Sequence, residues 1–142
     1  MSDELSGLEL LRECAAGKRP HPPMAETIPM KMVDINEGAV RFLVRAGSPH
    51  INPLGIVHGG FAATVLDSVT GCAVHTLLPA GVPYATIDLN VKFTKQIPID
   101  TDLWAVGKVI NISKKLGIAE GEIRDNDGNL YAHATASCLV KR

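Results

Sequence analysis

The pattern of apolar and polar side chains divides this chain into short alternating segments and one long apolar segment. The clearest alternation runs over residues 84–97, where Ile87, Leu89, Val91 and Phe93 predict the core-facing side of a strand. Similar patterns predict further strands over residues 30–36, 39–46, 103–112, 118–124 and 130–140. Residues 61–78 are apolar nearly all round, which predicts a buried helix. The sequence therefore predicts an α+β fold in which an antiparallel sheet packs against one long central helix.

Capping and turn residues mark the limits of the remaining elements. Ser6 and Glu9 have the spacing of a capping box, which predicts a short amphipathic helix within residues 1–19 that ends at Gly17. The proline-rich residues 20–29 predict an extended connector. Hairpin turns are predicted at Glu37–Gly38 and Asp127–Gly128.

The last predicted strand carries a row of small side chains that would let it approach the helix closely. These are Ala132, Ala134, Ala136 and Cys138. The chain contains no internal repeat or low-complexity tract, so residues 1–142 are predicted to form a single domain.

Composition excludes several classes of function. The net charge of −1 gives no basic surface for nucleic acid or an anionic membrane, so neither is expected as a partner. The acidic start, MSDELSGLEL, differs from a signal peptide, and we expect the protein to be cytoplasmic. The three cysteines, Cys14, Cys72 and Cys138, are widely spaced, which predicts neither a disulfide framework nor a metal site.

One carboxylate, Asp67, stands inside the apolar helical segment and is therefore predicted to lie within the protein. Burying an ionised carboxylate without a partner destabilises the folded state by about several kcal/mol. Either local hydroxyls such as those of Thr64 or Ser68 satisfy it, or it has a chemical function.

The residues just before this helix favour the functional alternative. Gly59 and Gly60 stand where the helix begins, so the unpaired N–H groups of its first turn could polarise a carbonyl group. Gly60 and Asp67 would share one helix face but lie about 10 Å apart along the axis, too far for one small group to contact both. A second helix running antiparallel would bring the two together, which predicts a two-fold dimer with shared sites.

Four segments of the chain resemble the hotdog-fold acyl-CoA thioesterases of the PaaI-like, phenylacetate-degradation-type branch. They are Asn52–Gly55, Val57–Gly60, Leu66–Ser68 and Thr86–Val91. The resemblance extends over most of the chain and implies a hotdog fold, in which the sheet wraps around the central helix. It also implies a homodimer that assembles further into a tetramer.

The resemblance implies hydrolysis of an acyl-CoA thioester, with CoA as part of the substrate and no separate cofactor. Asp67 would act as general base or as nucleophile, and the N–H of Gly59, with Gly60 beside it, would bind the thioester oxygen. The resemblance assigns three further residues to the site. Asn52 would orient the acyl group or water, and His58 would support the turn or lie beside the sulfur. Thr86 would hold the water. Lys114 and Lys115 would meet the nucleotide end of CoA.

Two alternative functions are less well supported by these residues. Hotdog-fold hydratases need an Asp two residues before Asn52 and a His after Leu54, where this chain has His50 and Gly55. A non-catalytic acyl-CoA-binding module would have no use for Asp67. The acyl group itself is predicted only as small aromatic or as a short to medium aliphatic chain, with an aryl-acetyl group as the first expectation.

Overall fold

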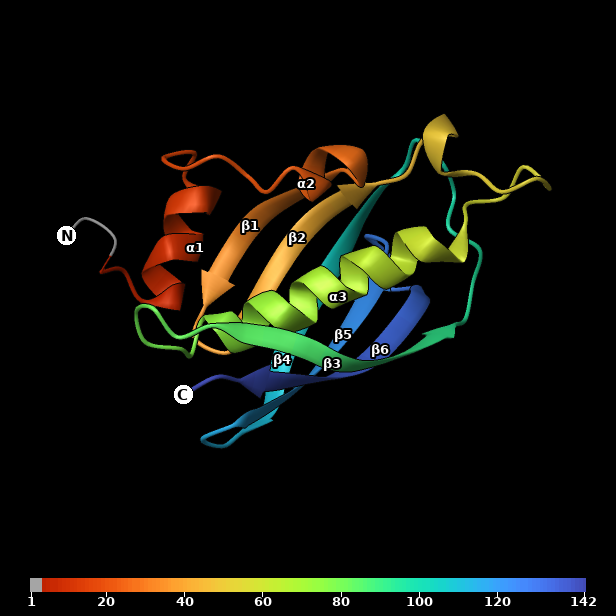
Figure 1. Ribbon diagram of the computed structural model, residues 1–142. Coiled ribbons are helices and arrows are strands. Elements are labelled where there is room, and N and C mark those ends of the chain that lie inside the picture. Colours follow the sequence, from red (N-terminus) through yellow and green to blue (C-terminus); the bar gives the residue numbers. More distant parts are fainter. Residues whose placement is uncertain (1–3) are drawn as a thin grey trace.

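The computed structural model describes residues 4–142, in which six antiparallel strands form one sheet that curves around a long helix, α3 (Gly59–His75) (Figure 1). The order across the sheet is β1 (Met30–Asn36), β2 (Ala39–Arg45), β4 (Asp102–Ile112), β5 (Leu116–Arg124), β6 (Leu130–Val140) and β3 (Tyr84–Phe93). This arrangement confirms the predicted α+β hotdog fold.

Close contact between α3 and the middle of the sheet depends on small residues in the strands. Val65, Leu66 and Val69 of α3 are fully buried against β4 and β5. A side chain at Gly107 of β4 would overlap the backbone carbonyl of Val69, so only glycine allows this approach. The small residues of β6 are also buried, as predicted: Ala132, Ala134, Ala136 and Cys138. The core therefore lies between α3 and the concave side of the sheet.

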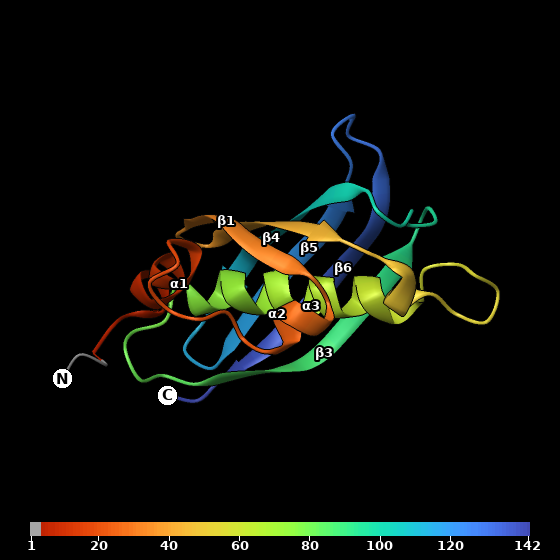
Figure 2. The same ribbon diagram turned by 90° about the horizontal axis from the view of Figure 1, so that it is seen from above.

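The amino-terminal helix α1 (Gly7–Ala15) begins with the predicted capping box. The Ser6 hydroxyl accepts the Glu9 N–H at 3.2 Å, and the Glu9 carboxylate accepts the Ser6 N–H at 2.9 Å. The helix packs against β1, with Leu11 and Cys14 buried (Figure 2). The first three residues of the acidic start lie outside the described part of the chain.

The connector before β1 is more ordered than predicted. It contains a one-turn helix, α2 (Met24–Thr27), which lies beside β1 and near α3 in the view of Figure 2. Pro22 and Pro23 occupy its start, where their carbonyls accept the N–H groups of Ala25 and Glu26 at 2.9 and 3.1 Å. Proline is tolerated at a helix start because its missing N–H is not needed there. A ten-residue extended connector was therefore the wrong expectation.

Two predicted boundaries and one predicted strand face are also wrong. α3 ends at His75 and not Leu78, because residues 76–78 close into tighter turns before Pro79. β3 ends at Phe93 and not Ile97, and a bulge between Thr86 and Asp88 shifts its register. The bulge leaves Ile87 60% exposed, although alternation placed it on the apolar face.

Within the described residues, no helix is both long enough and apolar enough to span a bilayer.

Candidate active site at the start and outer face of the central helix

The first turn of α3 offers one free backbone donor and not two. His58 is the N-cap, and its Nδ1 accepts the Gly60 N–H at 2.8 Å. Among residues 4–142, no acceptor meets the Gly59 N–H. The expectation that Gly60 also offers an open N–H is therefore wrong, because the preceding histidine caps it. With Nδ1 as acceptor, the neutral His58 ring carries its proton on Nε2.

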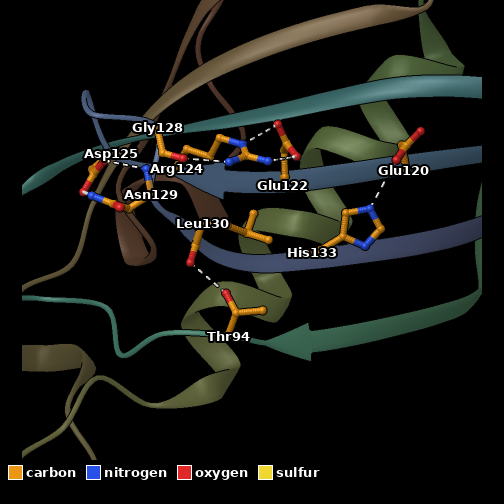
Figure 3. Close-up of polar contacts among 9 residues, drawn as sticks. All are labelled: Thr94, Glu120, Glu122, Arg124, Asp125, Gly128, Asn129, Leu130 and His133. Carbon is orange, nitrogen blue, oxygen red and sulfur yellow. Dashed lines mark hydrogen bonds and ion pairs between the residues drawn. The ribbon is translucent and has the colours of Figure 1, made fainter.

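A pocket of about 370 Å³ opens beside this free N–H. His58, Gly59 and Ala62 line one side, and residues 93–97 line the other. A side chain at Gly59 would come within 3.2 Å of the Phe93 ring, so glycine lets this ring lie against the helix start. Thr94 donates its hydroxyl proton to the Leu130 carbonyl at 2.7 Å, which ties the far wall to β6 (Figure 3). A group about the size of a thioester and its neighbours can enter here.

Asn52 holds the loop that leads to the site. Its Oδ1 accepts the N–H groups of Leu54 and Ile56 at 2.9 and 3.2 Å. The amide oxygen is thus used within the loop, and the Nδ2 group has no acceptor in the described part of the chain. Asn52 therefore fixes the conformation of the loop before α3, and of its side-chain groups only the Nδ2 amide can bind a ligand.

Asp67 lies on the exposed face of α3, contrary to the prediction that it lies inside the protein. The neighbouring residues Val65, Leu66 and Val69 are buried on the other side of the helix, whereas the Asp67 side is exposed in the part of the chain that the structure describes. The alternative that local hydroxyls satisfy Asp67 is also wrong: Thr64 donates its hydroxyl proton to the Gly60 carbonyl at 2.8 Å, and Ser68 makes no bond to Asp67 within residues 4–142. The Asp67 carboxylate has no hydrogen-bond partner among the described residues, so it is open to water and to a ligand.

The start of β3 lies alongside the middle of α3. The two elements run antiparallel, with Gly71 against the Tyr84 ring and Gly59 against Phe93, so Asp67 lies opposite the segment that contains Thr86. The Thr86 hydroxyl meets the Cys138 sulfur at 3.8 Å. Burial raises the pKa of the Cys138 thiol, and the negative charge of Asp67 raises it further. Thr86 and Asp67 thus lie on two elements that pack side by side.

Lys114 and Lys115 lie in the β4–β5 turn, at the opposite end of α3 from Gly59. The adjacent Gly117 contacts Val74 in the last turns of the helix. Two cations that the sequence pattern did not associate with this turn lie beside it. Arg142 donates to the Lys114 and Ser113 carbonyls at 2.7 and 3.2 Å, and Lys141 follows the end of β6. Strand pairing between β5 and β6 creates this cluster, which no local sequence signal marks.

The remaining chemistry-bearing residues have structural environments. His75 packs against the Tyr84 ring, and His133 meets Glu120 at 3.2 Å on the outer side of the sheet (Figure 3). Burial raises the pKa of the Cys72 thiol to about 12, so it stays protonated and is a poor nucleophile. Within residues 4–142, no three side chains of the His, Cys, Asp or Glu type converge in a way that could hold a metal ion.

Comparison with known proteins assigns the family. The family model described as the Thioesterase superfamily matches residues 54–132, more than half of the chain. The chain therefore belongs to the thioesterase superfamily. The matched segment runs from the loop before α3 into β6 and includes the helix start and Asp67.

Two curated relatives match over part of their length. A Halobacterium salinarum protein predicted to be an esterase is 44% identical over 68 residues, which are 46% of this chain and 44% of that protein. Mouse acyl-coenzyme A thioesterase 13 is 27% identical over 84 residues, which are 58% of this chain and 59% of that protein. The match thus spans about half the length of these relatives.

Solved structures match over nearly the whole fold. A phenylacetic acid degradation-related protein from Ralstonia eutropha has a TM-score of 0.81 at 27% identity, covering 90% of this chain and 97% of that one. A Streptococcus pneumoniae thioesterase structure with coenzyme A has a TM-score of 0.72 at 21% identity, covering 78% and 84%. The second of these shows the shared fold alone.

Proposed function

We propose that this protein is an acyl-CoA thioesterase, which hydrolyses the thioester to a free acid and CoA. The observation that carries the proposal is the single unoccupied N–H of Gly59 at the capped start of α3, on the same helix as the open carboxylate of Asp67. A free N–H at the positive end of a helix stabilises the negative charge that develops on a thioester oxygen during attack. Membership of the thioesterase superfamily supports the same chemistry.

In the proposed reaction, Asp67 supplies the basic or nucleophilic oxygen. As general base it takes a proton from water, and the water oxygen attacks the carbonyl carbon while the carbonyl oxygen remains bound to Gly59. As nucleophile it attacks the carbonyl carbon itself, and water then hydrolyses the resulting anhydride. In either route the carbon–sulfur bond breaks, and the thiolate leaves with the electron pair. Thr86, on the strand that packs beside α3, would hold the water for this attack.

The proposal requires two copies of the chain, because about 12 Å of helix separates Gly59 from Asp67. β3 is an edge strand, and its open edge lies on the same side as the exposed face of α3 (Figure 1). Ile87 and Phe93 of this strand are 60% and 59% exposed. A second copy related by a two-fold axis would cover both the edge and the helix face, and its Asp67 would meet this chain's Gly59.

The same arrangement accounts for the cationic cluster of Lys114, Lys115, Lys141 and Arg142. It lies at the carboxyl end of α3, which an antiparallel partner helix would bring close to Gly59 of the partner subunit. Phosphate groups of CoA are dianionic or monoanionic and bind lysine and arginine side chains. We therefore propose that this cluster binds the nucleotide end of the substrate. The S. pneumoniae structure with coenzyme A supports a CoA-binding role on this fold.

A panel of acyl-CoA thioesters, followed by the release of free thiol, tests the activity. Acetyl-, octanoyl- and phenylacetyl-CoA cover the expected range of acyl groups. Thiol release that is proportional to enzyme concentration is the expected result. Tight binding of acyl-CoA without turnover would identify a binding module in its place, and hydration of an enoyl-CoA without thiol release would identify a hydratase.

Mixing two inactive variants tests whether subunits share the site. Asp67→Asn removes the base, and Gly59→Pro removes the N–H, whereas Gly59→Ala adds a side chain but keeps the N–H and is the control. His58 has an extended backbone (φ −63°, ψ 139°), which suits a residue before proline. Random pairing of equal amounts should restore about a quarter of wild-type activity, because half of the dimers have one intact site of two. Verified heterodimers without activity would show that each chain carries its own whole site.

A further inference from the structure

A second, smaller pocket lies across the exposed face of α3 from Asp67. Its volume is about 60 Å³, and it lies between α2, β1 and α3. Its walls include Met24, Ala25, Met30, Met32, Phe42 and Cys72. The polar side chains of the lining are His21 and Ser68, and the other lining side chains offer no oxygen or nitrogen to a ligand. The pocket is therefore suited to an apolar group.

The helix geometry connects this pocket to the proposed reaction centre. Ser68 follows Asp67 directly, so its side chain is turned by about 100° around α3, and Cys72 lies one turn further on the same side. Thr64, between these faces, bonds back to the Gly60 carbonyl at 2.8 Å and leaves only its methyl group at the surface. A chain that leaves a carbonyl carbon at Asp67 can thus cross the helix surface over Thr64 and Ser68 and enter the pocket.

We infer that this pocket binds the distal methylenes of an unbranched aliphatic acyl chain, and this inference rests on the proposed thioesterase function. Its volume excludes an aromatic ring, since a cavity that holds benzene measures roughly 150 Å³. The three methionines can adjust to a narrow flexible chain, because their side chains have several rotatable bonds. The α2 turn closes one side, so this one-turn helix sets the length and width of acyl group that fits.

The state of Cys72 agrees with this assignment. Burial raises the pKa of its thiol to about 12. Cys72 therefore presents a neutral, apolar wall at working pH.

Substitution of Ala25 tests the inference. Ala25→Phe fills the pocket from α2, a surface turn, while Ala16→Phe places the same ring at an exposed position after α1 as a control. We expect kcat/KM for octanoyl-CoA to fall at least about tenfold in Ala25→Phe, with acetyl-CoA changed by less than about twofold, since acetyl has no methylenes to reach the pocket. An equal loss for both substrates, or no loss for octanoyl-CoA, would overturn the inference.

Widening the pocket gives an independent measurement. Met24→Ala shortens a half-exposed wall residue and should raise the ratio of kcat/KM for phenylacetyl-CoA over octanoyl-CoA by several fold, because a ring then fits better. Wild-type protein should prefer octanoyl-CoA to phenylacetyl-CoA. If the wild type hydrolyses thioesters but neither variant changes the acyl preference, this inference fails while the thioesterase function stands. If no acyl-CoA is hydrolysed by the wild type, both fail.

Discussion

The two long faces of α3 differ in what they contact and in what they can do. One face, with Val65, Leu66 and Val69, is fully buried against the sheet. The other carries the exposed Asp67 and short, partly exposed side chains such as Thr64. The sequence of α3 is apolar nearly all round, but its two faces differ in function. The buried face stabilises the fold, and the small side chains of the exposed face leave room for a substrate and a second subunit.

This division implies that substitutions on the two faces should separate stability from activity. On the buried face, added volume meets backbone atoms that cannot move. On the exposed face, the same change meets solvent or the end of a flexible side chain, so only groups with a chemical role should matter.

The largest effect on stability is expected for Gly107→Ala in β4. Its new methyl group would overlap the Val69 carbonyl, which is backbone and cannot rotate away. We expect a loss of about 3 kcal/mol in the free energy of unfolding, measured by urea denaturation. Gly59→Ala, which meets only the tip of the Phe93 ring, should cost far less. Equal losses in the two variants would show that the faces do not differ in this way.

The largest effect on activity without loss of stability is expected for Asp67→Asn. The change keeps the size of the side chain but removes the basic oxygen, so kcat should fall by at least about 100-fold. The free energy of unfolding should change by less than about 0.5 kcal/mol, because the carboxylate is exposed and unpaired. Asp127→Asn, at an exposed turn, is the control for the change of charge. A folded Asp67→Asn enzyme with near-normal kcat would exclude the proposed mechanism.

His58 both caps the start of α3 and lines the pocket beside Gly59, so its substitution should affect stability and activity. His58→Ala removes the acceptor of the Gly60 N–H and should cost about 1 kcal/mol of stability. His58→Asn supplies a side-chain oxygen that suits an N-cap and should restore most of the stability and of kcat. If His58→Asn regains stability but not kcat, the ring itself contributes to turnover beyond its capping role.

The smallest effect is expected far from both faces, at the β5–β6 turn. Hydrogen bonds lower the pKa of Asp125 to about 2, and the bond from the Asn129 side chain has the largest effect. Tyr131 donates a further bond that acts in the same direction. A lowered pKa in the folded state means that the ionised carboxylate stabilises the fold above its usual pKa near 3.8, and that this contribution is lost as the pH falls towards 2. The stability difference between wild type and Asp125→Asn should therefore shrink from pH 5 to pH 2, with kcat at neutral pH unchanged. A constant difference would exclude this role.

Much of the fold was predictable because its signals are local. The capping box at Ser6, the turns at Glu37–Gly38 and Asp127–Gly128, and the small residues of β6 each act over a few residues, and the structure confirms them. The bulge at Ile87 and the α2 turn were missed. The bulge depends on the pairing of β3 with β6, which are distant in sequence, and the α2 turn forms where the connector packs against β1.

The candidate site divides in the same way between sequence and tertiary structure. The sequence alone determined the family pattern around Gly59 and Asp67, because residue type and spacing on one helix need no other information. A local bond between neighbouring residues decided which donor is free, and tertiary structure decided which side of the helix is open. His58 folds back onto Gly60, and Asp67 faces outward because the sheet covers only one side of α3. Exposure depends on what packs against a residue, and an apolar sequence around a carboxylate cannot show whether a second element is present to bury it.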